Sequence, residues 1–135
     1  MPHVFEHSFS VQQKDIYFNG HVANDVFVRW MYETALQHSI SLGIDLDAYV
    51  EMNTMIVVRR NEVDYYYPAY EGDEIVVKTW MDELRRSSAT RYFEIRLKKD
   101  RRSLVKAKSI YVSLNLVTHR PASMPQRLIN AFGLS

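Results

Sequence analysis

The chain has no cysteine, only four glycines and four prolines among its 135 residues, and no long apolar run. The lack of cysteine excludes a disulfide scaffold, a thiol nucleophile and a thiolate metal site. No segment approaches the roughly 20 apolar residues of a membrane-spanning helix, and residues 1–7 lack the basic and apolar regions of a secretion signal. We therefore expect a cytoplasmic protein without a membrane partner, whose chemistry depends on oxygen and imidazole groups.

Length and composition favour a single domain over residues 1–135. The chain is 47% hydrophobic, which suffices for an ordinary core at this size. There are no repeats, low-complexity tracts or linkers. Nine tyrosines and two tryptophans supply amphipathic side chains that suit a partner surface, so we expect a homo-oligomer.

Charge is unevenly distributed along the sequence. The net charge is only +1, which argues against a general nucleic-acid binder. Residues 1–84 carry 5 basic and 14 acidic side chains, whereas residues 85–108 carry 10 and 2. The second block predicts an anion-binding surface, and the alternative is that its charges are solvated strand faces that protect sheet edges.

The spacing of apolar residues predicts one short strand, one long helix and then a series of strands. Phe9 and Val11 alternate with polar residues, as in a half-buried strand. A helix of roughly 18 residues is predicted from Asn24 or Asp25, either of which can cap it, to a stop at Gly43. Segments rich in Val, Ile, Tyr and Thr, and two shorter helical patterns, predict strands at 54–67, 73–81, 88–99 and 104–118 and helices at 45–51 and 124–132.

Short connections between the predicted strands indicate antiparallel hairpins in a meandering sheet, because parallel pairing needs long crossovers. The fold class is therefore α+β: an antiparallel sheet wrapped around one long central helix. One helix leaves much of the sheet uncovered, which again favours a homo-oligomer.

Polar residues are concentrated just before the predicted long helix. Asp15, Asn19, His21 and Asn24 lie within ten residues of one another, and Asn19 is followed by a glycine in a turn-forming pair. A helix that begins just past residues 20–22 presents unpaired backbone N–H groups and the positive end of its dipole to this segment. The segment therefore predicts a site that stabilises negative charge beside an imidazole.

Three sequence patterns resemble one known family. The first follows Asp-x-Asp-x-x-Gly-His-Val-Asn-Asn and is represented by Asp15, Tyr17, Gly20, His21, Val22 and Asn24. The second, Tyr-x-x-Pro-Ala-x-x-Gly-Asp, is intact at Tyr65, Pro68, Ala69, Gly72 and Asp73. The third, at residues 83–88, resembles a stretch whose basic residues contact the coenzyme A nucleotide. With these patterns the chain resembles the hot-dog fold, 4-hydroxybenzoyl-CoA thioesterase-like family of acyl-CoA and acyl-carrier-protein (acyl-ACP) thioesterases.

The resemblance implies hydrolysis of an acyl-CoA or acyl-ACP thioester, without a cofactor, in a cleft between protomers of a homotetramer built as a dimer of dimers. The five histidines are dispersed, so no metal site is expected. Adjacent residues of a strand point to opposite faces, so one of Arg59 and Arg60 is expected to face the cleft or an interface. The predicted substrate-binding residues are Gly20, Val22, Asn24, Arg60, Arg85 and Arg86, and the last two are expected to receive phosphates of the carrier.

The first pattern departs from the family at Tyr17, which stands where the family has its catalytic aspartate. A carboxylate of ordinary pKa is ionised at neutral pH, whereas a tyrosine is protonated and is a poor base. The loop also resembles the Asp-x-Asn-x-His of plant-type acyl-ACP thioesterases, of which Asn19 and His21 match. The predicted catalytic set is therefore Tyr17, Asn19, His21 and Asp15.

Three sources of the missing base remain open. His21 can act as the base with Asn19 and Tyr17 as hydrogen-bonding groups, or it can only fix the loop. Asp15 can act as the base, or it can cap the loop and pair with an arginine. The third source is an acid from a neighbouring subunit, Glu62 or Asp64. The competing function is a non-catalytic hot-dog protein that binds acyl thioesters, and a hydratase of the same superfamily is a weaker alternative.

Overall fold

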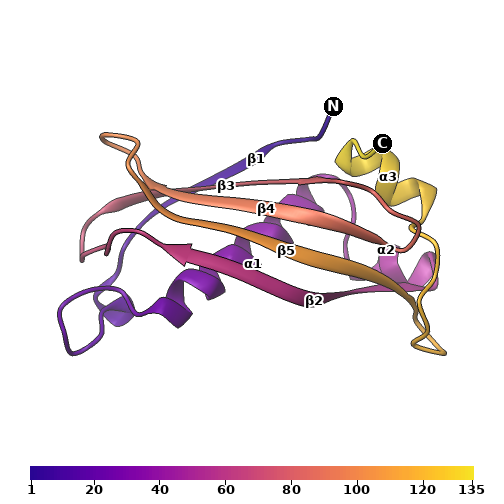
Figure 1. The fold of residues 1–135 in the computed structure, drawn as a ribbon, viewed down its shortest axis with the longest axis horizontal. Coiled ribbons are helices and arrows are strands. Elements are labelled where there is room, and N and C mark those ends of the chain that lie inside the picture. Colours follow the sequence, from indigo (N-terminus) through magenta and orange to yellow (C-terminus); the bar gives the residue numbers. More distant parts are fainter.

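The computed structural model describes residues 1–135 and contains a five-stranded antiparallel sheet, one long helix and two short helices (Figure 1). The strand order across the sheet is β1-β3-β4-β5-β2. The strands are β1 (Phe5–Ser10), β2 (Thr54–Tyr65), β3 (Glu74–Asp82), β4 (Ser88–Leu97) and β5 (Ser103–Asn115). The helices are α1 (Asn24–Ser41), α2 (Leu46–Glu51), α3 (Gln126–Phe132) and the single 3-10 turn η1 (Gln13–Asp15). The predicted α+β class, with one long helix against an antiparallel sheet, is confirmed.

The connection between β2 and β3 differs from the predicted meander. β3, β4 and β5 form consecutive hairpins, but β2 pairs with β5 at the far edge and not with β3. Residues 66–73 cross the end of the sheet, where the amides of Tyr66 and Tyr67 donate to the carbonyl of Leu104 at 2.8 and 3.3 Å. A connector of eight residues reaches roughly 26 Å, whereas three strand spacings amount to about 14 Å, so a short connection does not require a hairpin.

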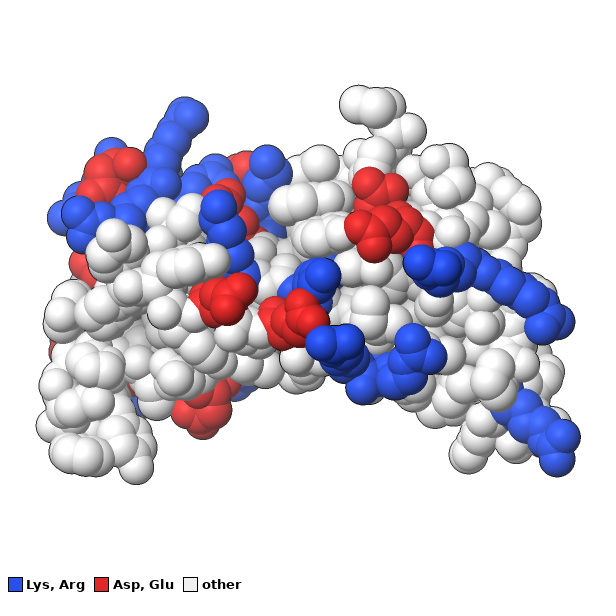
Figure 2. Space-filling view, viewed as in Figure 1, with Lys and Arg blue, Asp and Glu red and all other residues white.

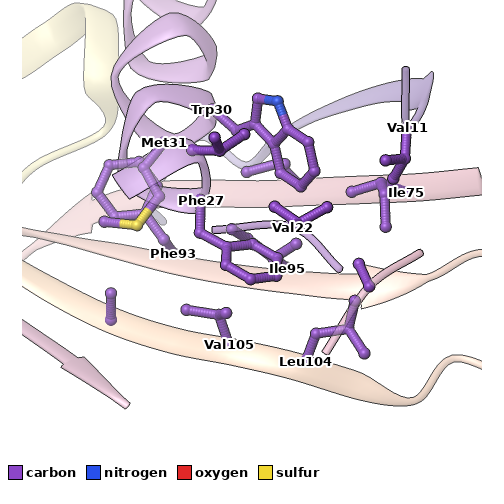
Figure 3. Packing of buried hydrophobic residues seen from close by; sticks show 14 of the residues in the cluster. Val11, Val22, Phe27, Trp30, Met31, Ile75, Phe93, Ile95, Leu104 and Val105 are labelled. Atoms are coloured by element: carbon purple, nitrogen blue, oxygen red, sulfur yellow. The ribbon is translucent and has the colours of Figure 1, made fainter. Parts of the chain in front are cut away.

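The main core lies between α1 and the sheet (Figure 3). The residues of α1 that are buried follow helical spacing and are Val26, Phe27, Trp30, Met31, Thr34, Ala35, His38 and Ser39. The sheet contributes Ile75, Val77, Phe93, Ile95, Leu104 and Val105. Burial of each large apolar side chain contributes about 1.5–3 kcal/mol, so packing against the sheet, more than helix propensity, holds α1 in place.

A second cluster of buried residues lies around the C-terminal end of α1, where α2 and α3 cover the end of the sheet (Figure 1). Its members are Ile44, Ala48, Met81, Ala89, Met124, Leu128, Phe132 and Leu134. α2 is capped by Asp45, whose carboxylate accepts a hydrogen bond from the amide of Ala48 at 2.9 Å. The polar segment singled out from the sequence lies at the opposite end of α1.

Candidate functional site

Residues 17–22 form a tight loop directly before α1, in which residues 17–20 are exposed and Val22 is buried. The amide of Tyr17 donates to the carbonyl of His21, and the amide of Gly20 donates to the carbonyl of Tyr17, each at 2.9 Å. Gly20 has a φ of +90°, where a side chain would strain the backbone. The predicted Asn-Gly turn is therefore confirmed.

His21 and Asn19 lie together on this loop. The His21 amide lies 3.4 Å from Asn19 Oδ1, and His21 Nδ1 lies 3.3 Å from the carbonyl oxygen of Val22. Because a carbonyl only accepts hydrogen bonds, a neutral His21 donates from Nδ1 and keeps the lone pair of Nε2 free. The half-buried ring lies edge-on to Tyr70, with 6.4 Å between the centroids. His21 is thus fixed to the backbone, and its second nitrogen remains available as a base.

The first turn of α1 has no side-chain cap. The N-cap residue is Ala23, so the prediction that Asn24 or Asp25 caps the helix is wrong, because both already belong to the first turn. The amide of Val22 donates to the carbonyl of Ala69 at 2.9 Å, whereas the amides of Asn24 and Asp25 donate to no protein atom. These two amides lie at the positive end of the helix dipole, where an oxyanion is stabilised.

Three of the predicted substrate-binding residues, Gly20, Val22 and Asn24, lie at this loop, and the backbone amides of two of them are already hydrogen-bonded within the protein. The amides of Gly20 and Val22 are used inside the protein, and only Asn24 offers a free one. The Asn24 carbonyl lies 3.5 Å from the Tyr65 hydroxyl. Burial, and to a lesser extent Asp25, raises the pKa of Tyr65, which keeps its hydroxyl a hydrogen-bond donor. Tyr17 is also exposed, and its ring leans on Phe18 at 4.8 Å between centroids.

Asp15 has a structural role. The residue is 4% exposed, and its Oδ1 accepts a hydrogen bond from Arg29 Nη2 at 2.7 Å while Oδ2 accepts one from the amide of Gln12 at 3.0 Å. Two alternatives were predicted for Asp15: it acts as the catalytic base, or it caps the loop and pairs with an arginine. The observed contacts favour the second alternative. Both carboxylate oxygens are occupied and turned away from solvent.

Arg59 and Arg60 are both exposed on the single chain, and the expectation that one of them faces the cleft or an interface stays a prediction. A β-bulge between Val58 and Arg60 interrupts the alternation of side chains on β2, which is an edge strand. Arg60 pairs with Glu62 at 2.5 Å, and Glu62 also lies 3.5 Å from Lys108. Arg60 therefore belongs to a surface ion-pair group.

Arg85 and Arg86 lie far from the loop in the same chain. They follow the end of β3, whereas the loop contacts Ala69 beside the start of β3, and the nine residues of this strand span roughly 30 Å. The basic block of residues 85–108 is divided between the core and the surface, and Lys and Arg side chains form separate groups on the face drawn in Figure 2. Within the block Arg91 is buried, and Arg96, Lys98 and Lys108 pair with glutamates.

An apolar cavity of about 330 Å³ lies beside the C-terminal half of α1. It runs between α1, α2, α3 and the sheet, and its walls include Leu36, Leu46, Val50, Ile56, Met124 and Leu128. Its volume is within the range of cavities that hold small molecules. The aromatic residues Phe27 and Trp30 do not line it, because they are packed in the main core.

One polar cluster that borders this cavity was missed by the sequence reasoning. Arg91 is 2% exposed, and its Nη1 lies 3.0 Å from both His38 Nδ1 and Thr79 Oγ1. His38 Nε2 in turn lies 3.0 Å from His3 Nδ1. Burial first, and then Arg91 and His3, lower the pKa of His38 to about 3, so His38 is neutral. The signal in the sequence was a histidine on the apolar face of a helix and an arginine at an inward position of a strand.

The other charged groups do not gather into a centre. No three His, Asp or Glu side chains lie close enough together to hold a metal ion. None of the three α-helices combines the length and the apolar character that crossing a membrane requires.

The sheet order and the long helix define the hot-dog class of fold. A 1,4-dihydroxy-2-naphthoyl-CoA thioesterase from Synechocystis superposes with a TM-score of 0.89 at 19% identity, covering 97% of this chain and 96% of that one. A 12:0-ACP thioesterase from Umbellularia californica superposes with a TM-score of 0.85 at 24% identity, covering 96% of this chain and 49% of that one. A Staphylococcus aureus protein in complex with CoA superposes with a TM-score of 0.89 at 14% identity, covering 98% of this chain and 84% of that one.

The family described as the acyl-ACP thioesterase N-terminal domain matches residues 2–132, so the chain belongs to the acyl-ACP thioesterase family. A chloroplastic palmitoyl-acyl carrier protein thioesterase from Arabidopsis thaliana is 25% identical over an alignment of 132 residues that covers 93% of this chain. A palmitoyl-acyl carrier protein thioesterase from Gossypium hirsutum is 26% identical over 132 residues. The chain spans about a third (32%) of the length of each of these relatives.

Proposed function

We propose that the protein hydrolyses an acyl-CoA or acyl-ACP thioester to a free carboxylic acid and a thiol. The observation that carries this proposal is the uncapped start of α1, with two free amides beside the exposed loop that holds His21 and Asn19. Membership of the acyl-ACP thioesterase family supports the same chemistry.

The proposed mechanism uses water and a histidine base. His21 Nε2 takes a proton from a water molecule as the water attacks the thioester carbonyl carbon. The amides of Asn24 and Asp25 receive the oxyanion, and the Tyr17 hydroxyl adds a donor from the loop. The C–S bond then breaks, and the proton held by His21 passes to the leaving thiolate. Asn19 orients the water or the carbonyl.

We further propose that a second copy of the chain completes the site. The loop lies at one end of α1 and the cavity at the other, and α1 is about 27 Å long. In a two-fold dimer with antiparallel α1 helices, the loop of one copy lies beside the cavity of the other. An exposed apolar stripe on α1, formed by Tyr32, Leu36 and Ile40, and the unpaired edge of β2 offer the surface for such contact. Of the two acids of β2 considered as partner-supplied bases, Glu62 pairs with Arg60 and Lys108, whereas Asp64 has no ion pair in the chain.

The test is release of free thiol from a panel of acyl-CoA and acyl-ACP substrates. The His21→Ala variant is expected to lose about 10²–10⁴-fold in kcat, as for removal of a general base. His119→Ala is the matched control, because His119 lies in an exposed turn away from the loop. Equal turnover by His21→Ala and the wild type would overturn the mechanism.

The replacement of the family's acid by Tyr17 favours one competing function, a protein that binds acyl thioesters without hydrolysing them. Turnover of no thioester, together with measurable binding of acyl-CoA, would establish that alternative. A Tyr17→Asp variant adds a second comparison, because a carboxylate at this position supplies the base that the family uses. Hydrolysis by Tyr17→Asp alone would show that the natural protein is a binding protein.

A further inference from the structure

The Arg91 guanidinium is buried without a carboxylate partner. Arg91 belongs to none of the ion pairs in the structure. Its two hydrogen-bond partners, His38 Nδ1 and Thr79 Oγ1, are neutral. The rings of Tyr111 and Phe132 lie 5.3 and 5.4 Å from its guanidinium carbon and contribute cation–π attraction. A buried cation of this kind is costly when no anion is paired with it.

One edge of this guanidinium, that of Nε, lacks a complete set of hydrogen-bond acceptors. Arginine carries five N–H donors, and Nη1 uses its two on His38 and Thr79. The N–H group of Nε is fully buried and donates to no protein atom, and the Tyr111 hydroxyl is a hydrogen-bonding group beside the guanidinium. Nε and Nη2 together form a fork that matches the two oxygens of a carboxylate.

The position of this free edge connects it with the apolar cavity. Arg91 is one of the residues that line the cavity, and the hydroxyl-bearing side chains of Tyr111, Tyr49 and Ser39 line the same space. The remaining wall is almost entirely aliphatic or aromatic. The mouth is flanked by Leu36, which is 59% exposed, and by α2. An occupant therefore meets apolar walls along its length and a desolvated cation at its inner end.

We propose that the cavity binds an aliphatic chain whose inner end is a carboxylate, held by the Nε–Nη2 edge of Arg91. The carboxylate gives up its hydration shell to a cation that is already desolvated, and the methylene chain fills the apolar part of the space. Two sources share this chemistry: a free fatty acid that enters with its carboxylate first, and an acyl thioester that carries a second carboxylate at its distal end. The second source rests on the proposed thioesterase function, whereas the first does not.

Binding to the purified protein tests the inference without any turnover. Decanoate and 1-decanol are compared by calorimetric titration, since they share a ten-carbon chain and differ in the terminal group. The wild type is expected to bind decanoate about tenfold or more tightly than 1-decanol, the range for hydrogen bonds to charged groups. Arg91→Met is expected to abolish or reverse this preference, and Arg102→Met, which removes an exposed arginine, is expected to keep it. Equal binding of both probes by the wild type, or an unchanged preference in Arg91→Met, would overturn the inference.

A second arm distinguishes the two sources. The rate of thiol release is compared for decanoyl-CoA and for the mono-CoA thioester of decanedioic acid. If the KM is lower for the dicarboxylate thioester than for decanoyl-CoA in the wild type, and higher in Arg91→Met, the distal carboxylate is the natural group. A preference for decanoate without any preference among thioesters identifies the free acid. Binding of decanoate with no turnover of any thioester removes the proposed function and leaves the inference standing.

Folding of Arg91→Met is checked by its thermal unfolding curve. Replacement of an unpaired buried charge by an apolar side chain of similar length is expected to leave the protein folded. If Arg91→Met does not fold, Arg91→Lys provides the comparison, because it keeps the charge and loses the fork. Arg91→Lys is expected to weaken decanoate binding about tenfold relative to the wild type. Undiminished binding by this variant would contradict the proposed two-point contact.

Discussion

The Asp15 carboxylate is held between the Arg29 guanidinium and the Gln12 amide and is almost completely buried. Arg29 itself is half exposed, so solvent weakens the pair relative to a fully buried one. Asp15→Asn is expected to lower the free energy of unfolding by about 1–3 kcal/mol, because one charge-assisted hydrogen bond is lost in a buried place. Urea unfolding at neutral pH measures this change.

The same variant separates a structural role from a catalytic one. Thiol release per folded Asp15→Asn molecule is expected to remain within a few fold of the wild type, because the carboxylate does not reach the loop surface. A loss of about 10²-fold or more in kcat with unchanged stability would instead identify Asp15 as the base.

His38 should make stability depend on pH. Its pKa is lowered to about 3 in the folded protein from an ordinary value of 6.5. Between these two pH values the unfolded chain therefore binds more protons than the folded protein does. The stability supplied by neutral His38 is complete above pH 6.5 and is lost as the pH falls toward 3, by up to about 1.4 kcal/mol per pH unit. Urea unfolding at several pH values is expected to show a smaller slope in His38→Gln, with His119→Gln as the control. Equal slopes in all three proteins would contradict this assignment.

The sequence predicted correctly those residues whose conformation or partner is determined by neighbours in the sequence. Gly20 lies in a turn with positive φ, as its Asn-Gly pair indicates. Asp15 pairs with an arginine, which was one of its two predicted roles. Arg91 and His38 were not identified, because their roles depend on contacts between positions 53 residues apart. Neither has a neighbour in sequence that reveals such a contact.

The start of α1 is the element on which the proposed chemistry depends. Ala23 has φ −72° and ψ 151°, a conformation that suits an N-cap, but its methyl group accepts no hydrogen bond. Ala23→Asp places a carboxylate where it can accept from the free Asp25 amide. The variant is expected to be more stable by about 0.5–2 kcal/mol and to hydrolyse thioesters more slowly, because the new cap competes with the oxyanion.

The two effects of Ala23→Asp are measured separately, by thermal unfolding and by thiol release. Ala23→Val gives a control of similar bulk without an acceptor, and it is expected to gain no stability. A more stable Ala23→Asp protein with undiminished kcat would show that the oxyanion is received elsewhere.

Element boundaries followed from composition, whereas the pairing of elements did not. α1 ends next to Gly43, and β3, β4 and β5 pair as hairpins as predicted. β2 pairs with β5 at the far edge, because a connector of eight residues is long enough to cross the end of the sheet and its length alone does not select the neighbouring strand. The same pairing leaves Arg59 and Arg60 exposed on an edge strand, where a bulge interrupts the alternation of side chains.

At the scale of the whole molecule, the loop and the cavity are separated along α1, and the proposed dimer brings them together. The apolar stripe of Tyr32, Leu36 and Ile40 is the surface on which this depends. Leu36→Glu is expected to shift the protein toward the monomer in sedimentation velocity and to reduce turnover, because a charge is buried without a partner. Val117→Glu, at an exposed residue outside the stripe, is the control. A wild-type protein that is monomeric at micromolar concentration and fully active would refute the shared site.

Complementation between two inactive variants gives a stricter test of that arrangement. His21→Ala removes the base from the loop, and Ile56→Trp fills the cavity from a partly buried position on its wall. If each site combines the loop of one copy with the cavity of the other, a mixed dimer contains one site with both defects and one intact site. Random re-association makes half of the dimers mixed, so the mixture is expected to recover about a quarter of the wild-type activity. If loop and cavity act within one chain, every site keeps one defect and mixing restores nothing.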